Sequence, residues 1–389
     1  MGTSIDGSAV DKVLSTAVDS GAVPHVAAIA ADRDGIIYEG GAGPRVAGES
    51  ADTVTAGTQF RVMSMTKMVA TTVALQLRES GRLDFDAPVS EFCPEFADVP
   101  VLDGFDGDTP KLRRPRTQAT VRNLVTHTSG LGYWFFDADV ARYEQVTGTP
   151  NVLGGAGAFR APLLHDPGER FTYGINTDWL GKVLEAVTGK GLDVLIKENV
   201  TGPLGMNDTM FLLDDRRTAN CVTVHVPGEG GGWASAGELL PQQPDWWAGG
   251  HGLYSTPRDY IRFERALLRG GELDGERILR PETVDEAFRN QIGALDFPPE
   301  IPTADPQITC SFNAGPGWKW GYGLLLNNDD VPGGRKAGTG AWAGLFNTHF
   351  WVDRTTGICA SIYTNSLPFA EPGAFSLYVE FEQALYASL

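Results

Sequence analysis

The spacing of apolar residues predicts a helix and a hairpin near the start of the chain. Residues 11–21, DKVLSTAVDSG, have the periodicity of an amphipathic helix that ends at Gly21. The following segment, residues 25–43, contains two apolar runs around a turn at Asp34-Gly35, which is typical of a β-hairpin. The chain therefore begins with a helix followed by paired strands.

A second short apolar run leads directly into an apolar helix. The segment TQFRVMSMTK, residues 58–67, starts like a strand, and a helical pattern then extends from Ser64 to Ser80. Gly81 follows as a terminator of that helix. Ser64 thus lies at the predicted junction between strand and helix.

The remaining chain divides into a helical middle and a strand-rich end. Helical patterns and long Gly/Pro loops fill residues 87–249, where the glycine-rich segment 228–237 is predicted to be a surface loop. Strand patterns return near the C-terminus, which closes with a helix. We predict an α/β (α+β) fold with one sheet domain from residues 1–86 and 250–389, and a mainly helical inserted domain from residues 87–249.

Composition and charge restrict the partners. The chain of 389 residues is 42% hydrophobic and carries a formal net charge of -18, which repels polyanions, so we expect no nucleic acid partner. No window approaches the ~18 apolar residues of a membrane span, and the first residues lack the charged and apolar regions of a secretory leader. We expect a cytoplasmic protein that acts on a small neutral or cationic molecule. The oligomeric state stays open.

The cysteines indicate neither a zinc site nor a disulfide framework. Cys93, Cys221, Cys310 and Cys359 are widely separated and form no C-x-x-C pair. The histidines include no H-E-x-x-H motif. We expect buried or half-buried thiols, no metal and no cofactor.

A serine and a lysine three positions apart are the first candidate for chemistry. In a helix, residues i and i+3 share a face, so the amine of Lys67 can reach the hydroxyl of Ser64. Lysine is a base only when neutral, and burial among apolar neighbours and the positive end of the helix dipole both favour that form. In the alternative interpretation, Ser64 caps the helix and Lys67 reaches solvent.

Two other segments fit a catalytic site, although each also has a structural interpretation. Tyr173 lies at the entry to a predicted helix, where a phenol near an amine can shuttle protons or simply pack in the core. The small residues in KAGTGAWAGLFNTHFWVD, residues 336–353, indicate a strand that another backbone approaches closely, or a bulge. The chain has no G-x-S-x-G nucleophile elbow.

Four ordered segments together resemble the serine β-lactamase and penicillin-binding-protein superfamily. They are SMTK around Ser64, VTHTSGL at residues 125–131, YGIN with WLG at residues 173–181, and GGHGLYSTPRDYIRF at residues 249–263. With PLGMNDT at residues 203–209 and the closing WAGLFNTHFWVD, the resemblance covers nearly the whole chain. It implies a β-lactamase-like fold, with an antiparallel sheet flanked by the terminal helices.

Within this superfamily the chain is most similar to the family VIII carboxylesterases. Lactamases carry a K-T-G triad on the strand that lines the site, whereas this chain has Trp342-Ala343-Gly344, similar to the W-G-G variants of the esterases. The groups that would pair with a lactam carboxylate are thereby lost. Asn176 also stands one place later than the asparagine of the lactamase Y-x-N motif.

The resemblance implies a role for each site residue. Ser64 would attack the ester, and Lys67 and Tyr173 would carry its proton, with either of them as the base. The backbone N–H groups of Ser64 and Leu345 would form the oxyanion hole. Residues expected to line the substrate site are Trp342, Ala343, Gly344, Tyr133 and His251, whereas the other histidines are expected to be structural.

The leading hypothesis is a serine carboxylesterase that hydrolyses small, neutral esters through an acyl-enzyme. The aromatic residues 133–136 and 246–247 predict a narrow apolar pocket and hence short acyl chains. The alternatives are a β-lactamase, a D-alanyl peptidase or a small-amide hydrolase. A catalytically silent binding protein on the same fold is the hypothesis from another class.

Overall fold

The computed structural model describes residues 5–48, 52–237, 239–240 and 245–389, and its centre is an antiparallel seven-stranded sheet. The strand order is β13-β14-β15-β16-β17-β1-β2, so the N-terminal hairpin pairs with the last strand of the chain. The strands are β1 (Val26–Asp32), β2 (Ile36–Ala42), β13 (Trp318–Trp320), β14 (Leu325–Asn327), β15 (Gly340–Gly344), β16 (Thr348–Asp353) and β17 (Ile358–Tyr363). The predicted hairpin at Asp34-Gly35 and the sheet built from both chain ends are confirmed.

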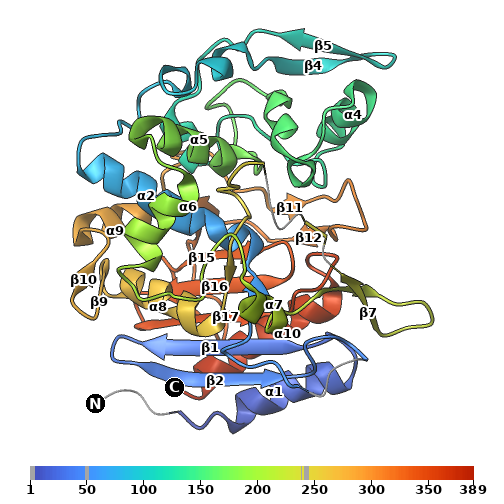
Figure 1. The fold of residues 1–389 in the computed structure, drawn as a ribbon, viewed down its shortest axis with the longest axis vertical. Coiled ribbons are helices and arrows are strands. Elements are labelled where there is room, and N and C mark those ends of the chain that lie inside the picture. Colours follow the sequence, from blue (N-terminus) through green and yellow to red (C-terminus); the bar gives the residue numbers. More distant parts are fainter. Residues whose placement is uncertain (1–4, 49–51, 238, 241–244) are drawn as a thin grey trace.

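The two faces of the sheet are covered by different helices. α1 (Ser8–Asp19) and α10 (Pro372–Ala387) lie against one face, while α8 (Pro257–Leu268) packs on the other (Figure 1). β1, β16 and β17 are buried along their whole length, so their alternate residues enter different cores on the two faces of the sheet. This arrangement is the predicted α/β fold with terminal helices beside the sheet.

Shorter elements make up the rest of the described chain, and much of this part lies at the top of Figure 1. The helices are α2 (Thr66–Glu79), α3 (Val121–Val125), α4 (Ala138–Thr147), α5 (Asn176–Thr188), α6 (Leu192–Ile196), α7 (Asp215–Ala219) and α9 (Pro281–Ala287). The short strands are β3 (Phe60–Arg61), β4 (Val101–Asp106), β5 (Thr109–Arg113), β6 (Val224–Pro227), β7 (Trp233–Gly237), β8 (Tyr254–Ser255), β9 (Glu272–Leu273), β10 (Glu276–Arg277), β11 (Glu300–Ile301) and β12 (Phe312–Asn313).

One expectation about the middle of the chain was wrong, and another stays a prediction. The second half of the glycine-rich segment 228–237 forms β7, which pairs with β6 rather than remaining a loop. The division into domains at residues 86/87 and 249/250 stays a prediction. Among the described residues, no helix is both long and apolar enough to cross a bilayer.

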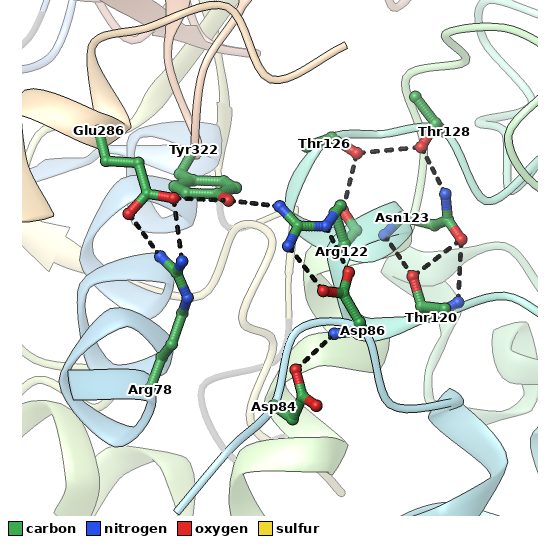
Figure 2. Close-up of polar contacts among 10 residues, drawn as sticks. All are labelled: Arg78, Asp84, Asp86, Thr120, Arg122, Asn123, Thr126, Thr128, Glu286 and Tyr322. Carbon is green, nitrogen blue, oxygen red and sulfur yellow. Dashed lines mark hydrogen bonds and ion pairs between the residues drawn. The ribbon is translucent and has the colours of Figure 1, made fainter. Parts of the chain in front are cut away.

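A polar network ties α2 to the elements around it (Figure 2). Arg78, near the end of α2, donates two hydrogen bonds to Glu286 of α9, at 2.8 and 2.9 Å. The hydroxyl of Tyr322 lies 3.3 Å from Glu286 and accepts a 2.6 Å hydrogen bond from Arg122 of α3. Arg122 also binds both carboxylate oxygens of Asp86. The network therefore joins α2 and α9 to Asp86 and α3.

The same network continues into the segment after α3. Thr120 and Asn123 form a reciprocal capping box at the N-terminus of α3. Asn123 donates a 2.9 Å hydrogen bond to Thr128, which in turn contacts Thr126 at 3.0 Å (Figure 2). These contacts fix residues 125–131, one of the segments that carry the family resemblance.

We expect Arg122→Met to lower the free energy of unfolding by about 1.5–3 kcal/mol, because hydrogen bonds from a half-buried guanidinium to Asp86 and Tyr322 are lost together. Arg258→Met removes the ion pair that a more exposed guanidinium forms with Glu39, and should cost no more than about 1 kcal/mol. Urea unfolding of both variants checks the difference. Equal losses would show that the Arg122 network does not brace the fold.

Candidate active site

Ser64 lies in a tight turn between strand β3 and helix α2. The turn is a 3-10 helix, Met63–Met65. Its first residue, Met63, directly precedes Ser64 and has a φ of 48°, in the left-handed region. Gly344 of β15 approaches this turn so closely that a Cβ atom there would lie 2.3 Å from the carbonyl oxygen of Val62. Only glycine permits this approach, which brings the edge of β15 beside the nucleophile.

Lys67 is fully buried beside the Ser64 hydroxyl. Its Nζ atom lies 3.2 Å from Ser64 Oγ and donates a 2.8 Å hydrogen bond to the carbonyl of Gly250. The spacing of three residues places both side chains on one face, as the sequence predicted. The alternative in which Lys67 reaches solvent is therefore wrong.

The surroundings of Lys67 favour its neutral form. Burial lowers the pKa of Lys67 to about 7, although the carboxylate of Asp178 opposes this shift. Burial likewise raises the pKa of Asp178, and the charge of Lys67 partly offsets that rise. An uncharged amine within reach of Ser64 can accept the hydroxyl proton, which a solvated lysine cannot do at neutral pH.

Tyr173 is held beside Ser64 by the indole of Trp342. Trp342 Nε1 donates a 3.0 Å hydrogen bond to the Tyr173 hydroxyl, and the two rings lie 4.8 Å apart. Burial raises the pKa of Tyr173, whereas its hydrogen bonds with Ser64 and Trp342 lower it in part. Tyr173 is therefore a neutral phenol beside Ser64 rather than a resident phenolate.

Tyr133 makes a contact that was not predicted for it. It lines the cavity as expected, but its hydroxyl also lies 3.0 Å from Lys67 Nζ. Lys67 is thus flanked by two phenols, with its Nζ 5.2 Å from the Tyr133 ring centre and 4.9 Å from that of Tyr173. Residue patterns showed only an aromatic cluster at residues 133–136 and no indication of this contact.

Asp178 is a site residue that the sequence did not reveal. It lies in the first turn of α5 with 1% of its surface exposed, and its Oδ1 accepts a 2.8 Å hydrogen bond from the N–H of Gly250. Because the carbonyl of Gly250 binds Lys67, Asp178 supports the lysine through that residue. His251 follows, with Nδ1 3.8 Å from Asp178 Oδ1. Acidic residues are common in the first turn of a helix, so the position of Asp178 in the sequence does not by itself indicate a site residue.

The segment at residues 125–131 positions Tyr173. The carbonyl of His127 accepts a 2.7 Å hydrogen bond from the N–H of Thr172, and the His127 ring lies 4.8 Å from the Tyr173 ring. Asn176 bonds to Ser129 at 2.5 Å and to the carbonyl of Leu131. The side-chain amide of Asn176 therefore holds the segment at residues 125–131 and does not contact Lys67. Lys67 instead binds Gly250 and Tyr133 beside Ser64.

A large cavity opens beside Ser64, Tyr133 and Tyr173. Its volume is about 560 Å³, and its walls include Ser64, Tyr173 and every residue predicted to bind substrate, namely Tyr133, His251, Trp342, Ala343 and Gly344. Much of the remaining wall is aromatic or aliphatic. This cavity is larger than the narrow pocket predicted from the aromatic residues, so the structure removes the reason for a limit to short acyl chains.

The two residues predicted to form the oxyanion hole, Ser64 and Leu345, both line this cavity. Ser64 is within the first turn of a helical segment, where backbone N–H groups have no partner inside the helix. Leu345 lines the cavity directly after Gly344, the last residue of β15 that pairs with β16. The role of these two N–H groups stays a prediction. Within the described ranges, no group of three or more His, Cys, Asp or Glu residues could hold a metal ion.

The sequence and the fold both define the class of protein. The model of the beta-lactamase family matches residues 10–385, and the chain belongs to that family. The fold superimposes with a TM-score of 0.84 on a mutant of simvastatin synthase from Aspergillus terreus, at 27% identity and covering 97% of this chain and 94% of the other. The predicted superfamily and fold are therefore confirmed.

Named relatives include both esterases and acyltransferases. The chain is 30% identical over 352 residues to monacolin J acid methylbutanoyltransferase of Aspergillus terreus, covering 85% of this chain and 82% of that protein. It is also 30% identical over 371 residues to lovastatin esterase of Penicillium rubens, covering 90% of each. EstCE1, a hydrolase with promiscuous acyltransferase activity, has a TM-score of 0.76 at 25% identity over 97% of both chains. The chain is an enzyme of the serine hydrolase and acyltransferase type.

The lowered pKa of Lys67 predicts how activity depends on pH. Below about pH 7 the amine is protonated and cannot accept the Ser64 proton, so kcat/KM should fall about tenfold per pH unit and reach a plateau above that value. Hydrolysis of p-nitrophenyl acetate across this range checks the profile. A rate that continues to rise toward pH 10 would mean that Lys67 titrates like an exposed lysine.

The contact between Tyr133 and Lys67 predicts that Tyr133→Phe lowers kcat by about tenfold to a hundredfold, because the buried amine loses a hydrogen-bond partner. KM for a small ester should change little, since the ring remains as a wall. Tyr143→Phe, in α4, is the matched control. A change confined to KM would assign Tyr133 to substrate contact alone.

Proposed function

We propose that this enzyme is a serine carboxylesterase, similar to family VIII, that acts on neutral esters through an acyl-enzyme on Ser64. The observation that supports this most strongly is the buried amine of Lys67, which lies 3.2 Å from the hydroxyl of Ser64 in the wall of a large cavity. A binding protein without activity would have no use for an amine buried at this cost. The names of the relatives support the same chemistry.

In the proposed mechanism Ser64 Oγ attacks the ester carbonyl as its proton passes to neutral Lys67, directly or through Tyr173. The N–H groups of Ser64 and Leu345 stabilise the oxyanion. Collapse of the intermediate breaks the bond to the alcohol, which takes the proton and leaves. Water then attacks the acyl-enzyme, the same groups accept its proton, and the acid is released with Ser64 restored.

The wall beside Ser64 favours esters over β-lactams and peptides. Trp342 stands on the strand where lactamases place the lysine of K-T-G, and its indole binds Tyr173 instead of presenting a cation. A substrate carboxylate would therefore find no lysine at this position of β15. Asn176 is likewise engaged with Ser129 and Leu131, away from Lys67.

An alcohol is a second candidate for the acceptor of the acyl group. The cavity of about 560 Å³ has room for an acyl group together with an acceptor larger than water. Acyl transfer needs the same proton steps as hydrolysis, with the alcohol hydroxyl in place of water. The partition of the acyl-enzyme between water and added alcohols, followed by mass spectrometry of the products, measures the share of each reaction.

Ser64→Ala should abolish turnover of p-nitrophenyl acetate, butyrate and octanoate, and should prevent labelling by a serine-directed phosphonate, because no other group can form the acyl-enzyme. Peptide mass spectrometry locates the label in the parent enzyme. Ser90→Ala, in the short 3-10 helix Val89–Glu91, is the matched control and should retain both reactions.

A chromogenic cephalosporin tested beside the esters separates the alternatives. Turnover of the cephalosporin alone would replace the esterase assignment by a β-lactamase. A parent enzyme that neither hydrolyses the esters nor accepts the phosphonate label would favour the silent binding protein.

A further inference from the structure

The carboxylate of Asp178 is buried without a direct counter-ion. Only 1% of the residue is exposed, and among the described residues no lysine or arginine forms an ion pair with it. The ring nitrogen Nδ1 of His251 lies 3.8 Å from Oδ1, and Oδ2 has no hydrogen-bond partner. A buried carboxylate is costly unless a nearby cation or hydrogen bonds compensate its charge. The position of Asp178 therefore requires a charge partner farther away.

A single residue joins Asp178 to Lys67. The N–H of Gly250 donates a 2.8 Å hydrogen bond to Asp178 Oδ1, and the carbonyl of the same residue accepts a 2.8 Å hydrogen bond from Lys67 Nζ. A Cβ atom on Gly250 would lie 2.4 Å from Asp178 Oδ2, so only glycine lets the carboxylate rest against this backbone. The acid and the amine are thus held in fixed positions relative to each other.

The other titratable side chains around this pair are uncharged near neutral pH. Burial lowers the pKa of two imidazoles and raises the pKa of two phenols, which belong to His127, His251, Tyr133 and Tyr173. The cation Arg61 lies over the ring of Tyr254 and adds to the lowering of the His251 pKa. Lys67 is the cation whose charge lowers the pKa of Asp178.

The two charges favour each other across Gly250. Burial raises the pKa of Asp178, and the charge of Lys67 opposes this rise. The carboxylate in turn raises the pKa of Lys67, against the larger effect of burial. An ammonium and a carboxylate together carry no net charge, whereas either charge alone would be uncompensated in the interior. Asp178 therefore makes Lys67 a stronger base than burial alone would leave it.

We propose that the carboxylate of Asp178 orients Lys67 through Gly250 and stabilises the ammonium that forms there during attack by the serine. In this step the O–H bond of Ser64 breaks, its proton binds the lone pair of Lys67 Nζ, and the proton later leaves with the alcohol. The carboxylate keeps its charge throughout. A buried aspartate has a similar effect on the histidine of Ser-His-Asp triads. Asp178 is thus a positioning residue, and this role rests on the proposed function, in which Lys67 is the base.

Asp178→Asn tests the charge, since the amide oxygen can still accept the N–H of Gly250 while the negative charge is removed. The acid limb of kcat/KM for p-nitrophenyl acetate should move about one pH unit below that of the parent, because the ammonium loses its counter-charge. At pH 6 the parent should retain about a tenth of its plateau rate and the variant about half. The plateau should fall by up to about tenfold, since the amine becomes a weaker base.

Asp259→Asn is the matched control. It makes the same exchange in the first turn of α8, where the carboxylate accepts hydrogen bonds from the backbone of Asp208 and the side chain of Thr209. This variant should keep the acid limb of the parent. The rate at which a serine-directed phosphonate labels Ser64 across the same pH range reports the attack alone. It should show the shift in Asp178→Asn and not in the control.

A reciprocal measurement needs neither a substrate nor a stable Asp178 variant. If the carboxylate raises the pKa of Lys67, the lysine must lower the pKa of Asp178 by the same amount, as thermodynamic linkage requires. Carbon NMR of the Asp178 carboxyl should therefore show a pKa that is higher by about one unit or more in Lys67→Met than in the parent.

The outcomes separate the role of Asp178 from the proposed function. An active parent whose acid limb is unmoved by Asp178→Asn would overturn the role of the charge and leave the esterase intact. The same limb shift in Asp259→Asn, or an Asp178 pKa that Lys67→Met does not change, would also overturn it. Failure of every ester, together with failure of Ser64 to take the phosphonate label, would remove the proposed function and the catalytic role of Asp178 with it. The carboxyl titration would then still show whether the two charges are coupled.

Discussion

The complete burial of one lysine amine is the constraint on which the rest of the structure depends. Lys67 can act as a base only if its charge is destabilised, and burial does this at a cost of several kcal/mol if no partner is supplied. Gly250 and Tyr133 provide those partners, and both come from parts of the chain far from α2. Asp178 holds Gly250 in place.

The rest of the fold can be understood from this requirement. Helix α2 carries Ser64 and Lys67, and it is packed into the interior and tied at its far end to α9 and α3 by the Arg78 network (Figure 2). The sheet contributes β15, whose Gly344 lets the strand approach the nucleophile turn. The same strand ends its pairing with β14 early, and the cavity extends through that gap toward α10.

Most of the features that could be predicted from residue patterns are local, and the sheet built from both chain ends is an exception. The hairpin at Asp34-Gly35 and the reach from Lys67 to Ser64 follow from spacing within a few residues. The contact of Tyr133 with Lys67 and the burial of Asp178 depend on segments far apart in the chain, and no local pattern reports them. For the same reason β7 was missed, because its pairing with β6 outweighs its glycine-rich composition.

The most direct test of the central claim is a titration of Lys67 itself. Carbon NMR of the enzyme labelled at lysine Cε, with Lys67→Arg used to assign the signal, follows the charge of this amine without any substrate. The account predicts one lysine with a pKa of about 7, far below the ordinary value of 10.5. A Lys67 signal that titrates near that ordinary value would contradict the proposed role of the amine as the base that activates Ser64.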